Sequence, residues 1–444
     1  MRSARNYPLL LVSQFLGAFG DNAILAVILG QLTFLQKAGQ ISEGQLSAAN
    51  ATYTSLLFVP YVLLAPLAGF LNDRYAKTRW LAGGNFIKLL GTLVAGLSVW
   101  HGAFWQGLGY FIVGIGGCVY SPAKYGILPE IVDRDRLVKA NGVLEFLTIG
   151  AILTGYIGGA AIIDRLPVLQ CYMILMVIYG LSLALNLLMA ATPSRTDVHL
   201  RGSVEEFFKN FGELLGNARL FRVLAGCGLF WLCGAAIKIN FQPWGLNVLK
   251  LQNNTQIALL GLWLSVGIMV GAILAGQLHR VGDLRRVRLY GWIMAGVVAL
   301  LGLVELLSGA GLLALDPTHI EIQHVNPLDT ALHGAGLDGG RWQVAVLLVL
   351  TGGLAGLFLI PLNAALQNEC NPARLGKTVA AQNFTDNLAM VAAGSLILIA
   401  ARARVNASGV FLYLAMLVAV VVTVLKVPPK RSPDAPATDA VPDI

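Results

Sequence analysis

The stretch Gly69-Phe-Leu-Asn-Asp73-Arg74-Tyr-Ala-Lys77-Thr-Arg79 places four charged residues in a short segment between two long apolar runs. Charged side chains are costly inside a lipid bilayer, whereas the flanking runs are long enough to cross one. The stretch is therefore predicted to be a cytoplasmic loop that joins two transmembrane helices. In such a loop, Gly69 and the four charged residues are better placed to latch neighbouring helices together than to contact a substrate.

The composition of the whole chain indicates the same membrane setting. Of its 444 residues, 12% are charged, whereas soluble domains have about 25%. Hydrophobic residues make up 56%, and the mean hydropathy is +0.70. A water-soluble fold of this size has too little interior to hide so much apolar surface. These values exclude a soluble enzyme and predict a helical protein that crosses the membrane many times.

Apolar runs bounded by charged or turn residues predict twelve transmembrane helices. The first run follows two arginines, as in a signal peptide, but it continues past Asp21 without a convincing cleavage site, so we count it as a span. The fold class is therefore an all-α membrane protein. The predicted helices lie at 8–35, 48–71, 80–100, 104–127, 138–162, 167–191, 220–248, 257–279, 287–309, 342–367, 376–401 and 407–426.

The distribution of lysine and arginine predicts the orientation of the chain. With both termini in the cytoplasm, 23 of the 31 basic residues fall in cytoplasmic segments, 6 fall outside and 2 lie within spans. Such an excess is the pattern of the positive-inside rule. The rule also accounts for the net charge of +8, so nucleic acid is not expected as a partner.

The two halves of the chain resemble each other. The stretch 276–280, Gly-Gln-Leu-His-Arg, follows the eighth run and precedes further arginines, as the charged loop follows the second run. The fifth span opens with Val-Lys-Ala-Asn-x-x-x-Glu at 138–145, and the eleventh with Val-Ala-Ala-Gln-x-x-x-Asp at 379–386. We therefore predict two pseudo-symmetric six-helix bundles, with the substrate site at their interface near the middle of the membrane.

The apolar runs also suggest the domain boundaries. Between the sixth and seventh runs, apolar residues recur at helical spacing from Val204 to Leu215 with charged residues opposite, which predicts an amphipathic helix on the membrane surface. The expected organisation is an N-terminal bundle at 1–191, a cytoplasmic amphipathic linker at 192–219, a C-terminal bundle at 220–427 and a disordered cytoplasmic tail at 428–444.

Six ionisable side chains are predicted to lie within the spans. Each costs about 2.5 to 3.5 kcal/mol at a helix centre, so function or pairing must compensate. A structural ion pair of Asp21 with Lys88 or Lys238 remains the alternative explanation for any one of them. A structural role for all six at once is not expected. The six are Asp21, Lys88, Lys124, Glu145, Lys238 and Asp386.

Features typical of metal sites and enzymes are weak in this chain. The 5 cysteines lie in apolar stretches and show no C-x-x-C spacing, so no metal, disulfide framework or cofactor is predicted. His324 and Asp329 match H-x-x-x-x-D, the pairing of a histidine base with its orienting carboxylate. This pair lies in the long outer loop at 310–341, without a catalytic domain around it. We therefore expect no enzyme, since a membrane acyltransferase would need His324.

Several motifs, taken together, resemble those of one known family. The charged loop at 69–79, G-x-x-x-D-R-x-x-x-x-R, resembles the signature of the major facilitator superfamily. The resemblance to one branch of it, the bacterial lysophospholipid transporters, extends over all twelve spans and fades in the 310–341 loop and after Lys426. Its motifs are Phe19-Gly-Asp-Asn-Ala23, Asn85-x-x-Lys-Leu-Leu-Gly91, Tyr120-Ser-Pro-Ala-Lys-Tyr-Gly-Ile-Leu128, Leu137-Val-Lys-Ala-Asn-Gly142, Pro361-Leu-Asn-Ala364 and Gln382-Asn383.

This resemblance implies a carrier of the major facilitator fold. Its substrates would be lysophospholipids, such as lysophosphatidylethanolamine, moved from the outer to the inner leaflet of a bacterial inner membrane. A separate acyltransferase would then reacylate them, and the expected partners of the carrier, itself a monomer, are this substrate and membrane lipids. The implied substrate-binding residues are Asp21, Asn22, Lys88, Tyr120, Lys124, Asn141, Glu145, Lys238, Asn363, Gln382, Asn383 and Asp386.

Two positions of this chain depart from the family pattern. The family has an arginine where this chain has Lys238, and a glutamate where it has Asp386. Lysine keeps the positive charge but lacks the planar fork with which arginine grips a phosphate through two hydrogen bonds. The headgroup preference therefore stays open.

The physical chemistry of lipids is consistent with such a carrier. Drawing a tail of about 15 methylenes through a watery cavity would cost about 12 kcal/mol, so the tail must stay in lipid and the cavity must open sideways. In this hypothesis Lys238, Lys124 and Lys88 meet the headgroup phosphate, while the carboxylates hold those lysines or meet an ammonium. The alternative is a proton-driven exporter of amphipathic drugs, with Asp21 or Glu145 as the proton carrier.

Overall fold

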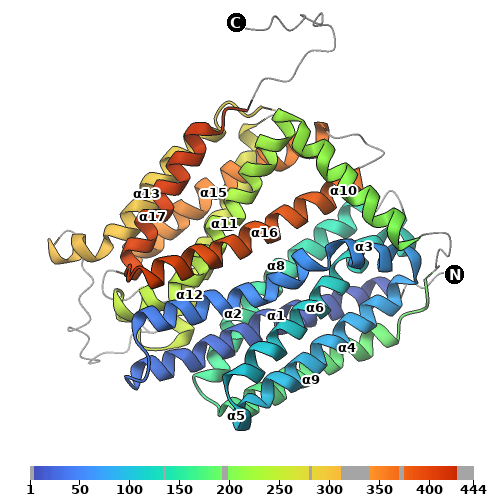
Figure 1. Cartoon of the computed structure of the whole chain (residues 1–444), viewed down its shortest axis with the longest axis horizontal. Coiled ribbons are helices and arrows are strands. Elements are labelled where there is room, and N and C mark those ends of the chain that lie inside the picture. The colour runs from blue at the N-terminus through green and yellow to red at the C-terminus, as the bar shows by residue number, and fades with distance from the viewer. Residues whose placement is uncertain are drawn as a thin grey trace, which may run out of the picture.

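The structure is a computed structural model that describes residues 5–133, 137–192, 199–279, 283–311, 341–369 and 375–427. In these ranges the regular elements are all helices, and they form two lobes that meet along one interface (Figure 1). The N-lobe consists of α1 (Asn6–Lys37), α2 (Glu43–Leu63), α3 (Ala65–Arg74), α4 (Lys77–Gly96), α5 (Ser98–His101), α6 (Ala103–Gly126), α7 (Leu128–Ile131), α8 (Leu137–Ile163) and α9 (Val168–Leu187). The C-lobe consists of α11 (Ala218–Asn247), α12 (Asn254–Leu278), α13 (Val287–Gly309), α15 (Trp342–Glu369), α16 (Leu375–Arg402) and α17 (Ala407–Val424).

The described ranges contain eleven segments that are long and apolar enough to cross a membrane, and a bent pair of helices supplies a twelfth. The bend is 57° and lies between α2 and α3, within the run at 48–71 that the sequence predicts as one span. Pro60 lies inside α2 and Pro66 in the first turn of α3. Proline lacks a backbone N–H and its ring clashes with the preceding turn, so it interrupts a helix. The prediction of twelve spans is confirmed, with the second one broken.

Glycines allow helices within each lobe to approach one another closely. In the N-lobe, a Cβ atom on Gly91 of α4 would lie 2.6 Å from the carbonyl oxygen of Gly109 of α6. In the C-lobe, Gly267 of α12 packs against the backbone of α15 at Val349 in the same way. Lipid tails are as apolar as helix surfaces, so close backbone packing of this kind is what holds membrane helices together.

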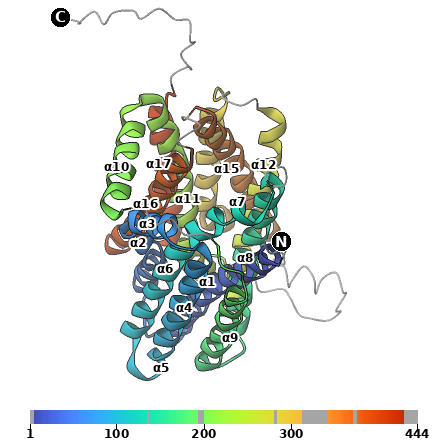
Figure 2. The same ribbon diagram turned by 90° about the vertical axis from the view of Figure 1, so that its right-hand side faces the viewer.

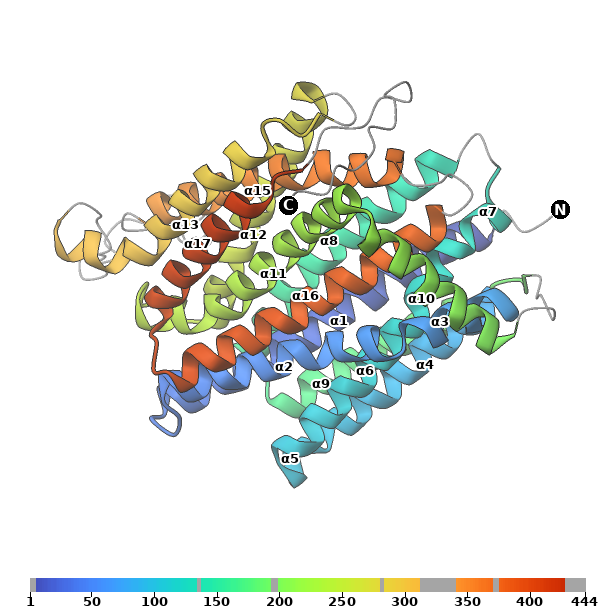
Figure 3. The same ribbon diagram turned by 45° about the horizontal axis from the view of Figure 1, so that its top comes forward.

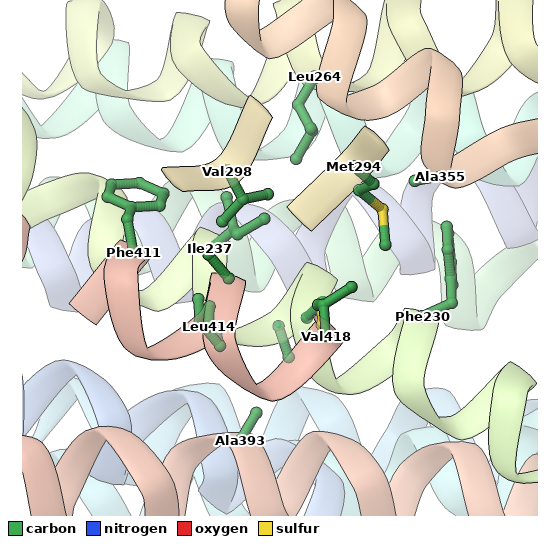
Figure 4. Close-up of a cluster of buried hydrophobic side chains, with 14 of the residues drawn as sticks. Phe230, Ile237, Leu264, Met294, Val298, Ala355, Ala393, Phe411, Leu414 and Val418 are labelled. Carbon is green, nitrogen blue, oxygen red and sulfur yellow. The ribbon is translucent and has the colours of Figure 1, made fainter. Parts of the chain in front are cut away.

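The interiors of the two lobes differ in polarity. In the C-lobe, apolar side chains such as Phe230, Met294 and Leu414 point toward one another from neighbouring helices (Figure 4). The cavity among them has a volume of about 30 Å³ and is lined almost entirely by apolar groups. The N-lobe buries an ion pair at its centre that includes Lys88, which is 2% exposed. The C-lobe also buries charge, at Asp386 and in the ion pair of Arg219 with Glu369.

Direct hydrogen bonds between the lobes gather at the end of the molecule opposite the N-terminus of α1, which we call the far end. Gln36 of α1 donates to the amide oxygen of Asn247 of α11 at 3.0 Å. Gln242 of α11 donates to the carbonyl of Leu29 and to the hydroxyl of Thr33, both on α1. Near the same end α2 begins and α16 ends, and these two helices lie side by side along the interface (Figures 1 and 3). These contacts close the far end.

The helix α10 (Leu200–Gly216) connects the two lobes near the opposite end. It contacts α3 of the N-lobe and both α16 and α11 of the C-lobe, and Figure 2 shows it along the side of the molecule. The rings of Phe207 and Phe211 meet the ring of Phe384 of α16 edge to face, with centroids 5.8 and 5.5 Å apart. One face of α10 is therefore anchored to the C-lobe by aromatic packing.

Candidate functional site

A buried ion pair lies at the centre of the N-lobe. The ammonium of Lys88 on α4 donates to Oδ2 of Asp21 on α1 at 2.6 Å, and their side chains are 3% and 17% exposed. The hydroxyl of Tyr179 on α9 donates to the other carboxylate oxygen, Oδ1, at 2.8 Å. Three helices thus hold the Asp21 carboxylate. Of the two pairings that the sequence leaves open for Asp21, the structure shows the one with Lys88.

Small residues on α1 make room for this arrangement. A Cβ atom on Gly20 would lie 2.7 Å from the ring of Tyr179, and one on Gly17 would lie 3.3 Å from the amide oxygen of Asn85. A larger side chain at Gly20 would therefore push the Tyr179 ring away from Asp21. The glycine next to Asp21 is needed for the hydrogen bond that Asp21 accepts.

A second polar network adjoins the ion pair, and its members apart from Asn85 lie outside the motifs quoted from the sequence. Asn85 of α4 donates to Ser182 at 2.7 Å and to Asn186 at 2.6 Å, both on α9. Asn186 in turn donates to the hydroxyl of Ser13 on α1 at 2.8 Å. Together with Tyr179, the two α9 residues form a polar stripe at helical spacing on one face of an otherwise apolar span. The helical spacing of these polar residues was the sequence feature that could have predicted the network.

Lys238 reaches from the C-lobe across the interface. Its ammonium lies 3.3 Å from the amide oxygen of Asn22 on α1 and 4.8 Å from the ring centroid of Tyr156 on α8. A cation over an aromatic face is stabilised by the ring quadrupole, but neither contact neutralises the charge. Lys238 therefore brings a positive charge from the C-lobe next to the Asp21 region of the N-lobe. The role of Tyr156 could not be read from the sequence.

Tyr120 and Lys124 continue the polar region along α6. The ring centroid of Tyr120 lies 5.1 Å from the ammonium of Lys88, and its hydroxyl lies 3.4 Å from that of Ser13. The ammonium of Lys124 lies 4.7 Å from the ring centroid of Tyr125, and Lys124 is 8% exposed. Tyr120 thus belongs to the central site. Lys124 lies one turn further along α6, toward the end of the molecule that holds the N-terminus.

The C-lobe residues predicted from the sequence form a separate cluster. Gln382 of α16 donates to the amide oxygen of Asn363 of α15 at 2.8 Å, and the thiol of Cys227 also contacts that oxygen. Asp386, one turn beyond Gln382, is 5% exposed, and its Oδ1 atom has no hydrogen-bond partner among the described residues. Asn383 is exposed and lies outside this cluster.

This C-lobe cluster and Lys238 lie at different depths. Gly228 of α11 faces Thr385 and Ala389 of α16, because a Cβ atom on Gly228 would lie 3.7 Å from a side-chain carbon of each. Asp386 therefore lies at about the level of Gly228. Lys238 follows Gly228 by ten residues, about 15 Å along a helix axis. One small headgroup therefore cannot contact Lys238 and Asp386 at the same time in this conformation.

One of the residues in the charged loop after the second span forms an ion pair with another helix. Lys77 at the start of α4 forms a 2.5 Å ion pair with Glu130 of α7, a residue that the sequence motifs did not single out. Arg74 lies over the rings of Phe70 and Tyr75. In the same loop, Arg79 is exposed, and a Cβ atom on Gly69 would meet no atom within 4 Å. The latch that is visible here joins α4 to α7.

Some predicted residues lie outside what the structure describes. These are the side chains of Asp73, Asn141 and Glu145 and the whole of the His324 and Asp329 pair. Within the described ranges, no group of three or more histidine, cysteine, aspartate or glutamate residues is placed to hold a metal ion. The central site consists of one ion pair, Asp21 with Lys88, together with amide and tyrosine side chains.

Comparison with known proteins relates this geometry to a family. The family model of the Major Facilitator Superfamily matches residues 10–318. The lysophospholipid transporter LplT of Photorhabdus laumondii is 32% identical over 395 residues, which cover 87% of this chain and 86% of that protein. LplT of Pectobacterium carotovorum is 32% identical over 398 residues, which cover 87% and 84%.

Solved structures share the fold at lower identity. A POT family transporter in complex with a thioalcohol-conjugated peptide has a TM-score of 0.68 and 13% identity, with 95% of both chains covered. The human organic anion transporter MFSD10 has a TM-score of 0.64 and 13% identity, with 95% of this chain and 99% of that chain covered. The fold class and the family that the sequence motifs indicate are thus confirmed. The chain belongs to the major facilitator superfamily and, within it, to the family of the bacterial lysophospholipid transporters.

Proposed function

We propose that the protein is a flippase that moves lysophospholipids from the outer to the inner leaflet of a bacterial inner membrane. One observation carries the proposal: among the residues that the structure describes, the ammonium of Lys238 at the lobe interface has no carboxylate partner. Lys238 contacts the Asn22 amide and the Tyr156 ring, and the ion pairs among the described residues do not include it. The relatives at 32% identity are named lysophospholipid transporters, which supports this choice of substrate.

The electrostatics of the site favour a phosphate at Lys238. Lys238 is half-buried and has lost part of its hydration, which is unfavourable for a cation without a counter-ion. Its attraction to an incoming anion is weakly screened, because the surrounding medium has a low dielectric constant. Lys88 is already neutralised by Asp21, whose second oxygen is bound by Tyr179. An incoming phosphate therefore gains more at Lys238 than at Lys88. We assign Asp386 as the acceptor for a headgroup ammonium at a later point on the path, because its buried Oδ1 atom has no hydrogen-bond partner among the described residues.

The lipid tail sets the second requirement. Moving it through water would cost about 0.8 kcal/mol for each methylene, so it stays among the membrane lipids while the headgroup crosses between the lobes. The described contacts fit this division, because Asp21, Lys88 and Asp386 lie inside the lobes and Lys238 lies at their interface. The outer faces of the lobes carry exposed apolar side chains such as Ile273 and Leu187.

The closed far end supports a specific place for this conformation in the proposed transport cycle. If the basic residues mark the cytoplasmic side, the far end faces the outside of the cell. The central site is then shielded from the outer surface, as is needed after a headgroup has entered and before it leaves on the inner side. Rocking of the lobes about the site would open the far end for the next substrate.

The proposal is tested with the purified protein in lipid vesicles. A lysophospholipid labelled in its headgroup is added to one side, and its movement between leaflets is followed by protection from an impermeant quencher or from extraction by albumin. We expect movement in vesicles that contain the protein, none in empty vesicles, and the lysophospholipid recovered chemically unchanged. A proton-driven drug exporter would instead need a pH gradient and would leave the lysophospholipid in place. Movement that depends on a pH gradient, with the lysophospholipid left in place, would contradict the flippase and favour the drug exporter.

A further inference from the structure

A carboxylate of the N-lobe grips the first turn of a C-lobe helix at the far end. Asp164, just past the end of α8, accepts four hydrogen bonds from the first two residues of α12. Its Oδ1 atom accepts from the backbone and side-chain nitrogens of Asn254 at 3.1 and 2.8 Å. Its Oδ2 atom accepts from the backbone nitrogen and the hydroxyl of Thr255 at 2.9 and 2.7 Å.

A second carboxylate of the N-lobe makes the same kind of contact on another helix. Glu43, at the start of α2, accepts a hydrogen bond from the backbone nitrogen of Ala407, the first residue of α17, at 3.0 Å. Both C-lobe helices begin with an asparagine cap, Asn253 before α12 and Asn406 before α17, which binds the third N–H of its own helix. The caps leave the first N–H of each helix free for a partner from the other lobe.

The physical chemistry of helix ends explains why these contacts hold. The first N–H groups of a helix have no partner within it, and the aligned peptide dipoles give that end a partial positive charge. A carboxylate placed there gains from both effects. Gly30 of α1 permits the close approach, because a Cβ atom on it would lie 2.5 Å from Ile163 and 3.3 Å from the side-chain nitrogen of Asn254.

We propose that Asp164 and Glu43 form a two-point clamp that holds the far end closed and must release in every transport cycle. Each carboxylate belongs to one lobe and each bound helix end to the other, so opening the far end breaks all five hydrogen bonds. Water then solvates both sides, because the groups lie at a helix end near the membrane surface. The clamp sets the balance between the two conformations without touching the substrate.

The test measures the distance between the lobes at the far end. Spin labels are attached to Gln40→Cys and Ala403→Cys, which are exposed residues of the N-lobe and the C-lobe, after the native cysteines have been replaced. Pulsed electron resonance then gives the distribution of distances without lipid substrate. We expect a short distance in the parent protein and a longer one that gains at least tenfold in relative population in Asp164→Ala, with a further gain in Asp164→Ala/Glu43→Ala.

Glu305→Ala is the matched control. Glu305 lies near the same end and accepts a hydrogen bond from Ser408 of α17, but both residues belong to the C-lobe. This variant removes an equal charge without loosening a contact between lobes, so its distances should match the parent. Asp164→Asn and Glu43→Gln keep the side-chain shape if the alanine variants fold poorly, and they should give a smaller shift in the same direction. An unchanged distribution in the double variants, or an equal shift in Glu305→Ala, would refute the clamp. Because the readout needs no lysophospholipid, this result is independent of the proposed substrate.

Discussion

The hydroxyl of Tyr179 and the ammonium of Lys88 bind different oxygens of the same carboxylate, that of Asp21, at 2.8 and 2.6 Å. The carboxylate is thereby held on two sides by side chains from two other helices. Both partners stabilise the negative charge of the carboxylate through hydrogen bonds. Rearrangement of this trio during transport requires that Asp21 exchange one partner for another.

Tyr179→Phe tests the second of these contacts. The variant removes a single hydrogen bond to a charged group, which contributes about 1.5 to 3 kcal/mol, while the ring remains to fill its place. We expect lysophospholipid movement in vesicles to slow by about tenfold or more. Tyr172→Phe is the control on the same helix, because Tyr172 binds Gln106 rather than Asp21. Equal rates in both variants would remove Tyr179 from the site.

The ion pair itself is tested by a double-mutant cycle. Lys88→Met alone or Asp21→Asn alone disrupts the pair, and each is expected to lower the free energy of unfolding in detergent by about 3 to 5 kcal/mol. The double variant Lys88→Met/Asp21→Asn should lose less free energy of unfolding than the sum of the two single losses. The reason is that it leaves no unpaired charge in the interior, whereas each single variant leaves one. Strict additivity of the two single effects would show that the residues do not interact.

Gly20→Ala tests the packing that positions Tyr179. Its Cβ atom would lie 2.7 Å from the tyrosine ring, so the ring must move. We expect a loss of about 1 to 3 kcal/mol in the free energy of unfolding, together with slower lipid movement. Gly180→Ala is the matched control, because a Cβ atom there meets nothing within 4 Å. That control should be neutral or slightly stabilising, since alanine favours helix more than glycine does.

Hydropathy and the positions of the charged loops were sufficient to predict the twelve spans and the fold class. The bend between α2 and α3 was also readable in principle, because Pro60 and Pro66 lie inside the predicted run. The polar stripe on α9 was missed because Ser182 and Asn186 are single polar residues in a strongly apolar span, and such residues look neutral in any averaged hydropathy.

The contacts between the two lobes could not be predicted from the sequence. Lys238 was singled out as a buried charge, but its position beside Asn22 and Tyr156 depends on how the two bundles are tilted in this conformation. The sequence analysis did not single out Asp164 and Glu43, because three of their five hydrogen-bond donors are backbone N–H groups, which carry no sequence signal. Spacing along one chain does not specify the relative position of two separately folded bundles.

The central claim is that the positively charged side chain of Lys238 binds the headgroup phosphate during transport. The most direct test compares two substitutions at this position. Leaflet-resolved movement of a labelled lysophospholipid is measured in vesicles that contain the parent protein, Lys238→Arg or Lys238→Gln at equal amounts of folded protein. Lys209→Gln, which neutralises an exposed lysine on α10, serves as the control. We predict that Lys238→Arg and the control move lipid at rates within a few-fold of the parent, while Lys238→Gln is slower by about 100-fold. Parent-like movement in Lys238→Gln would contradict the account.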